Sequence, residues 1–256
     1  MRIVLCANHR AGYEALLLLL SEGFTDKDSI LVFTHANSDS KKIIRECLKL
    51  NIQCIDKNIN NFENEVSKFS PHIILSCYYR YIIKGHILSL AKLGCLNIHP
   101  SLLPNYKGTF SSPWAIINNE KLSGISIHEM VEQVDNGNII SQESIEIFPS
   151  DTAYSLYHRL VSLAIKMLPN ALKLYLSGFR GVKQKLEIDK SKLYFSRNLP
   201  FGGVLKTKDT TYEEASRFIR AMFFPPYDGA KFELNSGVVK EANAIEDIES
   251  FVHEFK

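Results

Sequence analysis

The chain has 256 residues, 45% of them apolar, and its 30 Lys and Arg nearly balance 28 Asp and Glu, for a formal net charge of +2. A chain of this length can bury a large core as one domain, or as one domain with a small appendage. So small a charge bias gives no electrostatic case for binding nucleic acid or a membrane surface.

The cysteines and the apolar runs indicate the compartment. The five cysteines are spread out and form no C-x-x-C pair, so we expect reduced thiols in a reducing compartment and no metal site. The longest uninterrupted apolar run, residues 15–20, is too short to cross a bilayer. The first seven residues lack the features of a signal peptide. We therefore expect a cytoplasmic protein without a membrane partner.

The first half of the chain alternates short β-branched runs with amphipathic stretches. This alternation predicts right-handed βαβ units around a parallel sheet with flanking helices, an α/β fold. In such sheets ligands bind beyond the carboxyl ends of the strands. The expected strands are residues 2–7, 30–34 and 72–77, the expected helices are 13–21, 40–50 and 61–69, and residues 8–12 are expected to form a loop.

The second half continues with strands expected at 96–98, 124–130 and 138–147. The last alternates, as expected for a strand exposed on one face or at a sheet edge. The longest helical pattern, residues 151–176, is expected to kink at Pro169 and to stop at Gly178. After residue 181 the segments become shorter, and Thr211 with Glu214 has the spacing of a capping box. We expect a main domain at residues 1–181 and a small C-terminal α/β module at 182–256.

The most informative segment is residues 96–108, which read L-N-I-H-P-S-L-L-P-N-Y-K-G. Asn97 and His99 are two residues apart at a strand end, so their side chains project from the same face. A second polar cluster places Asp135 before Gly137 in a tight turn between two strands. The sequence thus places an imidazole and a carboxamide side by side, with a carboxylate in a later turn.

These three side chains suit acyl transfer to an amine if folding brings them together. His99 could collect the amine proton, because histidine titrates near neutral pH. Asn97 could stabilise the developing oxyanion, and Asp135 could orient the imidazole. From spacing alone, however, one His beside one Asn is more often structural, and Asp-Asn-Gly is more often a plain turn.

The pattern N-I-H-P-S-L-L-P-x-Y-x-G, followed by an Asp-x-Gly turn, resembles the folate-dependent formyltransferase family. The resemblance implies a Rossmann-like fold, catalytic roles for Asn97, His99 and Asp135, and 10-formyltetrahydrofolate as cofactor. It also implies a cis Leu103–Pro104 bond. The residues it implies for cofactor binding are Cys77, Tyr78, Leu103, Pro104, Val131, Val134 and Gly137.

Within this family, the chain most resembles the sugar-nucleotide N-formyltransferases. The glycinamide ribonucleotide enzymes carry a Gly-Ser-Asn turn after the first strand, where this chain reads Asn-His-Arg-Ala-Gly, and the methionyl-tRNA enzymes end in a longer, basic domain. Residues 218–232 are similar to the C-terminal module of the sugar-nucleotide enzymes, although their aromatic side chains could equally be core or dimer interface. The implied substrate-binding residues are His9, Arg10, Tyr79, Arg80, Tyr106, Arg220, Phe223, Phe224 and Tyr227.

The resemblance suggests a nucleotide-linked amino-dideoxy sugar as acceptor, with dTDP-4-amino-4,6-dideoxyglucose favoured, for surface polysaccharide such as O-antigen. It also suggests a homodimer through the C-terminal region, where residues 222–226 are apolar. Three alternatives stay open: a methionyl-tRNA-type or other small-amine formyltransferase, a formyltetrahydrofolate hydrolase, and a folate-binding module without activity. The intact set of Asn97, His99 and Asp135 argues against the last.

Overall fold

A computed structural model describes residues 1–185 and 193–256, which divide into two compact units. The first unit contains residues 1–99, 125–143 and 161–185, and the second contains residues 100–124, 144–160 and 193–256. Two segments from before residue 181 therefore belong with the C-terminal region, and the division expected at residue 181 stays a prediction. No helix in the described ranges is long and apolar enough to span a bilayer.

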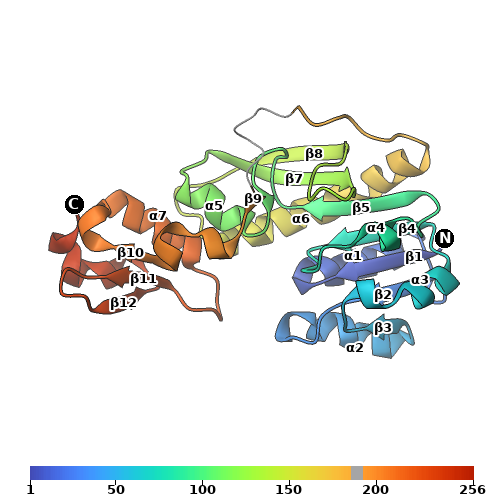
Figure 1. Ribbon diagram of the computed structural model, residues 1–256, viewed down its shortest axis with the longest axis horizontal. Helices are drawn as coiled ribbons and strands as arrows, with labels where there is room; N and C mark the ends of the chain where they lie inside the picture. The colour runs from blue at the N-terminus through green and yellow to red at the C-terminus, as the bar shows by residue number, and fades with distance from the viewer. Residues whose placement is uncertain (186–192) are drawn as a thin grey trace. The chain divides into compact units, whose positions relative to one another are not determined.

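A seven-stranded sheet has the order β3-β2-β1-β4-β5-β7-β8 (Figure 1). All neighbouring pairs from β3 to β5 are parallel, and β7 runs antiparallel to β5. This confirms the expected mostly parallel sheet, and β8 lies at an edge, which is one of the two placements that its alternating pattern allows. The strands are β1 (Ile3–Ala7), β2 (Ile30–Phe33), β3 (Gln53–Ile55), β4 (Ile73–Cys77), β5 (Gly94–His99), β7 (Leu122–Glu129) and β8 (Ile139–Glu146).

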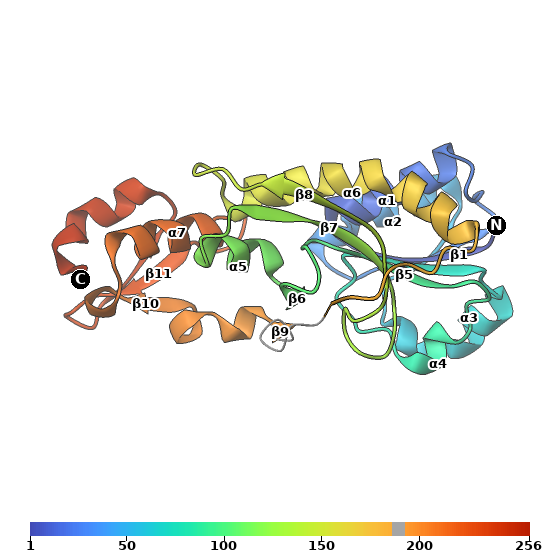
Figure 2. The same ribbon diagram turned by 90° about the horizontal axis from the view of Figure 1, so that it is seen from above.

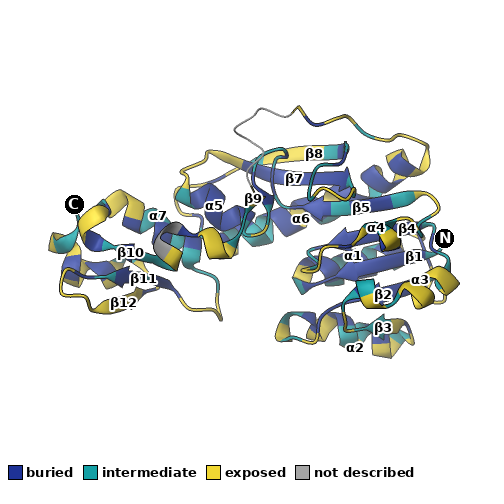
Figure 3. Ribbon diagram, viewed as in Figure 1, coloured by how far each residue is buried: buried dark blue, intermediate teal, exposed yellow. Residues whose placement is uncertain are grey.

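Helices cover both faces of this sheet because its central strands are apolar on both sides. Every residue of β1, β2 and β4 is buried (Figure 3). Val4 of β1 packs in one cluster with Val66 and Ile87 of α3 and α4, and Figure 2 shows α1 and α2 on the opposite face. The helices are α1 (His9–Ser21), α2 (Lys41–Leu50), α3 (Glu63–Phe69) and α4 (Gly85–Leu88).

The start of α1 differs from the loop expected at residues 8–12, because the helix already begins at His9. Gly12, the last residue of the expected loop, instead lets the helix approach the sheet. A Cβ at Gly12 would lie 2.7 Å from the Cβ of Ala7 in β1. The glycine therefore marks a close helix–strand contact inside a helix, not the end of a loop.

The longest helix, α6 (Ala153–Leu176), contains Pro169 in its interior, and Gly178 follows its end with a φ of +99°. A left-handed glycine is a frequent helix stop, so the expected end is confirmed. The elements of the first half that the sequence pattern did not predict include the strand β3 and the helix α4. The helix α5 (Ser111–Ile117) was not predicted either, and all three are too short to display a period.

The second unit contains a small sheet of β10 (Val204–Lys206), β11 (Ala230–Glu233) and β12 (Val239–Ala242). Helix α7 (Tyr212–Met222) packs on β11 and begins at the expected capping box of Thr211 and Glu214. Phe218, Phe232 and Phe251 fill the core between these elements. A further pair, β6 (Lys107–Gly108) with β9 (Leu193–Tyr194), is parallel. These elements confirm the small C-terminal α/β module.

Candidate active site

Two polar clusters lie beyond the carboxyl ends of the parallel strands. The chain runs through β1, β2 and β3 on one side and then continues with β4 on the other side of β1. The loops after β1 and β4 therefore diverge at the point where open α/β sheets bind ligands. One cluster lies at this switch point, and the other lies at the end of β5.

Asn97, His99 and Asp135 come together at the end of β5, as the family resemblance implies. The Nδ1 atom of His99 is 3.5 Å from Oδ2 of Asp135, and Nδ2 of Asn97 is 3.4 Å from Oδ1 of the same carboxylate. His99 is only 3% exposed, so the carboxylate acts on it with little screening by water. The arrangement can hold a proton on His99 while Asn97 supplies an amide donor.

A second histidine, His128, belongs to this cluster and was missed by the sequence analysis. It faces Asn97 across the β5–β7 ladder, and its Nε2 lies 3.1 Å from Nδ2 of Asn97 and 3.4 Å from Oδ1 of Asp135. Its Nδ1 is 2.7 Å from the carbonyl oxygen of Glu129. The signal that could have revealed His128 is its place in the strand preceding the Asp135 turn.

Two features fix the turn that carries Asp135, namely the close approach of Gly137 to Glu129 and the hydrogen bonds from Gln184. Asp135 has a left-handed φ of 51°, and a Cβ on Gly137 would lie 2.0 Å from the carbonyl oxygen of Glu129. The side-chain nitrogen of Gln184 donates to the carbonyl oxygens of Asp135, at 2.9 Å, and of Gly137, at 2.8 Å. Gln184 was also missed, because no local pattern connects it to a turn nearly fifty residues earlier.

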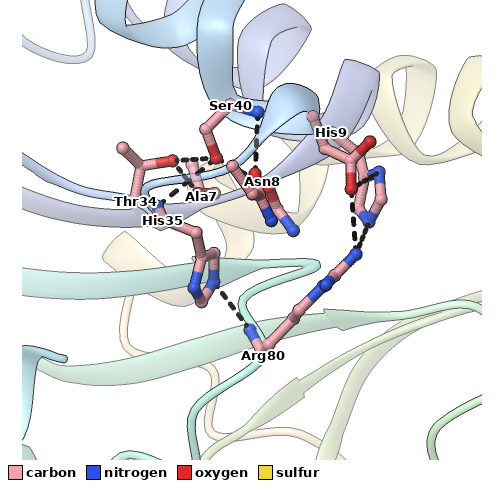
Figure 4. A network of polar contacts seen from close by, with 9 residues as sticks. Ala7, Asn8, His9, Thr34, His35, Ser40 and Arg80 are labelled. Atoms are coloured by element: carbon pink, nitrogen blue, oxygen red, sulfur yellow. Dashed lines mark hydrogen bonds and ion pairs between the residues drawn. The ribbon is translucent and has the colours of Figure 1, made fainter. Parts of the chain in front are cut away.

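The second cluster joins His9, after β1, to Arg80, after β4 (Figure 4). Arg80 Nη2 lies 2.9 Å from Oδ2 of Asp39 and 3.3 Å from Nε2 of His9, while the Arg80 backbone nitrogen donates to Nε2 of His35 at 3.1 Å. Burial lowers the pKa of His35 to about 4, with a further contribution from Arg80, and burial also lowers the pKa of His9. These imidazoles therefore lose charge at neutral pH, and Arg80 is the cluster's permanent cation.

Asn8 lies beneath this cluster and is fully buried. Its Oδ1 accepts from the Ser40 hydroxyl at 2.8 Å, whereas its Nδ2 is buried without a hydrogen-bond partner in the described part of the chain. A buried donor of this kind requires an acceptor, so it suits an anionic group bound at the switch point.

The other expected substrate residues of the first unit have structural contacts. Arg10 is exposed on α1 and pairs with Glu14 one turn later. The Tyr79 hydroxyl donates to the carbonyl oxygen of Lys57, and its ring packs on His35 with centroids 4.7 Å apart. Neither contact tests the expected role in substrate binding, which stays a prediction.

The second unit holds the remaining expected residues. The Leu103–Pro104 bond is cis, as the resemblance implies. The Tyr106 hydroxyl donates to Glu120, and Arg220 donates to the carbonyl oxygen of Asp151 at 2.9 Å. Phe223 is half-buried, Tyr227 is 51% exposed, and Phe224 contacts Tyr227 with ring centroids 6.1 Å apart.

The expected folate-binding residues of the first unit flank the Asn97 cluster in sequence. Cys77 ends β4 and is buried, and Tyr78 follows it with a left-handed φ of 57°. Val131 is exposed and Val134 is half-buried in the segment leading to Asp135. Because Cys77 is fully buried, its pKa is raised and it remains a neutral thiol.

Comparison with known proteins places the chain in a family. The model of a family described as formyl transferase matches residues 23–172. A protein of Brucella melitensis named GDP-perosamine N-formyltransferase is 40% identical over 216 residues, covering 82% of this chain and 81% of that protein. The bifunctional polymyxin resistance protein ArnA of Wigglesworthia glossinidia brevipalpis is 35% identical, covering 90% of this chain and 36% of that protein.

Solved structures share the fold. The structure of WlaRD, described as a sugar 3N-formyl transferase in the presence of dTDP and 5-N-formyl-THF, superposes with a TM-score of 0.74 at 24% identity. The match covers 90% of this chain and 82% of that one. The matched residues 23–172 and the 40% identity over most of both chains establish that this chain belongs to the formyl transferase family.

Proposed function

We propose that this chain transfers a formyl group from 10-formyltetrahydrofolate to the amino group of a nucleotide-linked amino-dideoxy sugar. The observation that carries the proposal is the cluster at the end of β5, where one carboxylate lies within 3.5 Å of both an imidazole and a carboxamide. The relatives named GDP-perosamine N-formyltransferase support the sugar-nucleotide acceptor.

Each member of the cluster has a separate role in this proposal. His99 accepts the proton that the amine loses as it attacks, directly or through a water, and passes it toward the departing nitrogen. Asp135 orients the imidazole and offsets its charge once it is protonated. The Asn97 amide nitrogen donates to the formyl oxygen as negative charge develops there.

The residues present fit a folate. In the described part of the chain, Gln184 Oε1 is buried without a hydrogen-bond partner, on the same carboxamide that holds the Asp135 turn. A pterin ring carries N–H donors that such an acceptor requires. When bound, 10-formyltetrahydrofolate supplies the formyl group. The residues proposed to hold it are Cys77, Tyr78, Leu103, Pro104, Val131, Val134 and Gly137.

The cluster at the switch point suits the diphosphate of a sugar nucleotide. Arg80 offers a cation, His9 offers ring nitrogens, and the unpartnered Nδ2 of Asn8 offers a buried donor. A phosphate oxygen accepts from all three kinds of group. We therefore propose that His9 and Arg80 bind the diphosphate, and that the Asp39 carboxylate positions Arg80 for this contact.

Two acceptors are proposed for direct comparison. The family resemblance suggests dTDP-4-amino-4,6-dideoxyglucose, and the 40% identity to relatives named for GDP-perosamine supports that compound as the second candidate. The proposed product is an N-formylated sugar nucleotide for surface polysaccharide such as O-antigen. A homodimer through the C-terminal region is also proposed, and light scattering of the purified protein would test it.

The deciding experiment incubates the protein with 10-formyltetrahydrofolate and a panel containing both nucleotide sugars, with products read by mass spectrometry. Transfer predicts that one sugar gains the mass of a carbonyl while tetrahydrofolate appears in equal amount. His99→Asn should abolish this product, while His72→Asn, a histidine that accepts from the Arg2 backbone nitrogen at 3.0 Å, should not. Formate release without sugar modification would refute transfer and support a hydrolase.

A further inference from the structure

His128 is a buried histidine of the Asn97 cluster to which the proposed mechanism assigns no step. It lies on β7 directly opposite Asn97 of β5, and it is 1% exposed. Side chains of directly opposed residues project from the same face of a sheet, so the imidazole and the carboxamide meet side by side. The following inference deepens the proposed function and rests on it, because it concerns the group that would stabilise the formyl oxygen.

The hydrogen bond to Glu129 fixes the tautomer of His128. Its Nδ1 lies 2.7 Å from the Glu129 carbonyl oxygen, and a carbonyl oxygen can only accept. Nδ1 therefore carries a hydrogen in every protonation state. In the neutral ring, Nε2 must then be the acceptor, whereas in the charged ring both nitrogens are donors.

The neighbours of Nε2 distinguish these two states. Asn97 Nδ2 is 3.1 Å away and can donate to a neutral Nε2. Asp135 Oδ1 is 3.4 Å away and can accept from a charged Nε2–H. A neutral His128 therefore holds the nitrogen end of the Asn97 carboxamide together with Asp135 Oδ1, whereas a charged His128 repels that nitrogen and competes with it for the same Asp135 oxygen.

The direction of the Asn97 carboxamide matters because its two ends have similar shapes and opposite chemistry. Rotation by about 180° exchanges the amide nitrogen for the oxygen at almost no steric cost. With the nitrogen held beside His128, it also faces Asp135, at 3.4 Å, on the side of the proposed proton acceptor. With the oxygen there, the cluster would present an acceptor where the formyl oxygen needs a donor.

We propose that neutral His128 is a positioning residue that keeps the nitrogen of the Asn97 carboxamide directed toward the reacting formyl oxygen. Protonation of His128 opposes this in two ways. It removes one of the two acceptors at the Asn97 nitrogen, and it engages the Asp135 carboxylate that His99 requires.

The Asp135 carboxylate lies close to the imidazoles of both His128 and His99. Asp135 is 3.4 Å from His128 Nε2 and 3.5 Å from His99 Nδ1, and the two rings have centroids 6.3 Å apart. Asn97 and the Glu129 carbonyl are the neutral groups at the ring. A charged His128 would compete with His99 for the Asp135 carboxylate, so the proposed role requires a neutral His128.

Two substitutions distinguish the role of His128 as a hydrogen-bond acceptor from the space that its ring fills. His128→Gln keeps an oxygen that can accept from Asn97 and cannot titrate, whereas His128→Leu fills similar space with no acceptor. We expect His128→Gln to keep kcat within about threefold of wild type. We expect His128→Leu to lower kcat by about 100-fold with little change in KM, because a misdirected catalytic group can reduce the rate of the chemical step by about that factor. The matched control, His72→Leu, removes a histidine outside the cluster and should leave kcat unchanged.

The result that overturns the proposal is an equal kcat for the Gln and Leu variants, both with wild-type melting temperatures. Should the Leu variant fail to fold, the tautomer decides the matter. Nitrogen NMR of labelled histidines in the free wild-type protein should show His128, identified by its loss in His128→Gln, as neutral with hydrogen on Nδ1 at the pH of full activity. Hydrogen on Nε2 at that pH refutes the role. Absence of formyl transfer by the wild-type protein would instead refute the proposed function. The NMR measurement reports the His128 tautomer independently of activity, so the two failures can be told apart.

Discussion

The substitution Asp135→Asn should stop the reaction while leaving the fold intact. Asp135 Oδ2 lies 3.5 Å from His99 Nδ1, and at an effective dielectric constant of about 20 a carboxylate and an imidazolium at that separation attract by about 5 kcal/mol. Asparagine keeps the shape and loses this charge. Because about 1.4 kcal/mol is a factor of ten in rate, we expect kcat to fall by roughly 1000-fold.

The assay is the formylation of the acceptor sugar by mass spectrometry, with melting temperature measured in parallel. The matched control is Asp26→Asn, which removes a carboxylate that only accepts from the Asp28 backbone nitrogen. We expect the control to retain wild-type kcat. A kcat for Asp135→Asn within about tenfold of wild type would show that the charge does not stabilise a protonated His99, and the reasoning would fail.

Three further predictions concern the turn and the switch-point cluster. Gly137→Ala should lower unfolding free energy by about 2 kcal/mol, because its Cβ would lie 2.0 Å from the Glu129 carbonyl oxygen; an unchanged urea midpoint would contradict this. Arg80→Ala should raise KM for the sugar nucleotide by about 10- to 100-fold with little effect on kcat, and steady-state kinetics with an unchanged KM would exclude Arg80 from the diphosphate site. His35 has a pKa of about 4 against an ordinary 6.5, so its contribution to stability is complete above pH 6.5 and is lost as pH falls toward 4, by about 3 kcal/mol. His35→Gln should remove that part of the pH dependence in thermal unfolding, and an identical pH dependence in the variant would refute its origin.

The sequence pattern was sufficient for those parts of the site that follow from local periodicity. The β-branched runs predict the parallel strands, and a strand end is where a sheet presents side chains to a ligand. The two-residue spacing of Asn97 and His99 therefore predicted their common face correctly. Asp135 was a weaker case, because an Asp-x-Gly turn has no chemistry of its own and only the family resemblance connected it to His99.

The residues that were missed depend on register and on long-range contacts. His128 meets Asn97 because β7 pairs antiparallel with β5 in one register, and a shift by one residue would turn His128 to the other face. No pattern within either strand specifies that register. Gln184 reaches the Asp135 turn from the segment after α6, a contact that only the folded chain reveals. The loop expected at residues 8–12 was wrong for a related reason, since the contact of Gly12 with Ala7 lies between two elements.

The geometry of Asp135 shows how the first unit delivers a carboxylate between two imidazoles. A left-handed φ of 51° costs a non-glycine residue about 1 kcal/mol, so the conformation needs support from its surroundings. Gln184 bonds the carbonyl oxygens of Asp135 and Gly137, and Gly137 lies too close to the Glu129 carbonyl to admit any side chain. The strain is thus balanced by backbone contacts that leave both carboxylate oxygens available to side chains. Because Oδ2 faces His99 and Oδ1 faces His128, one turn supplies the carboxylate contact of both imidazoles.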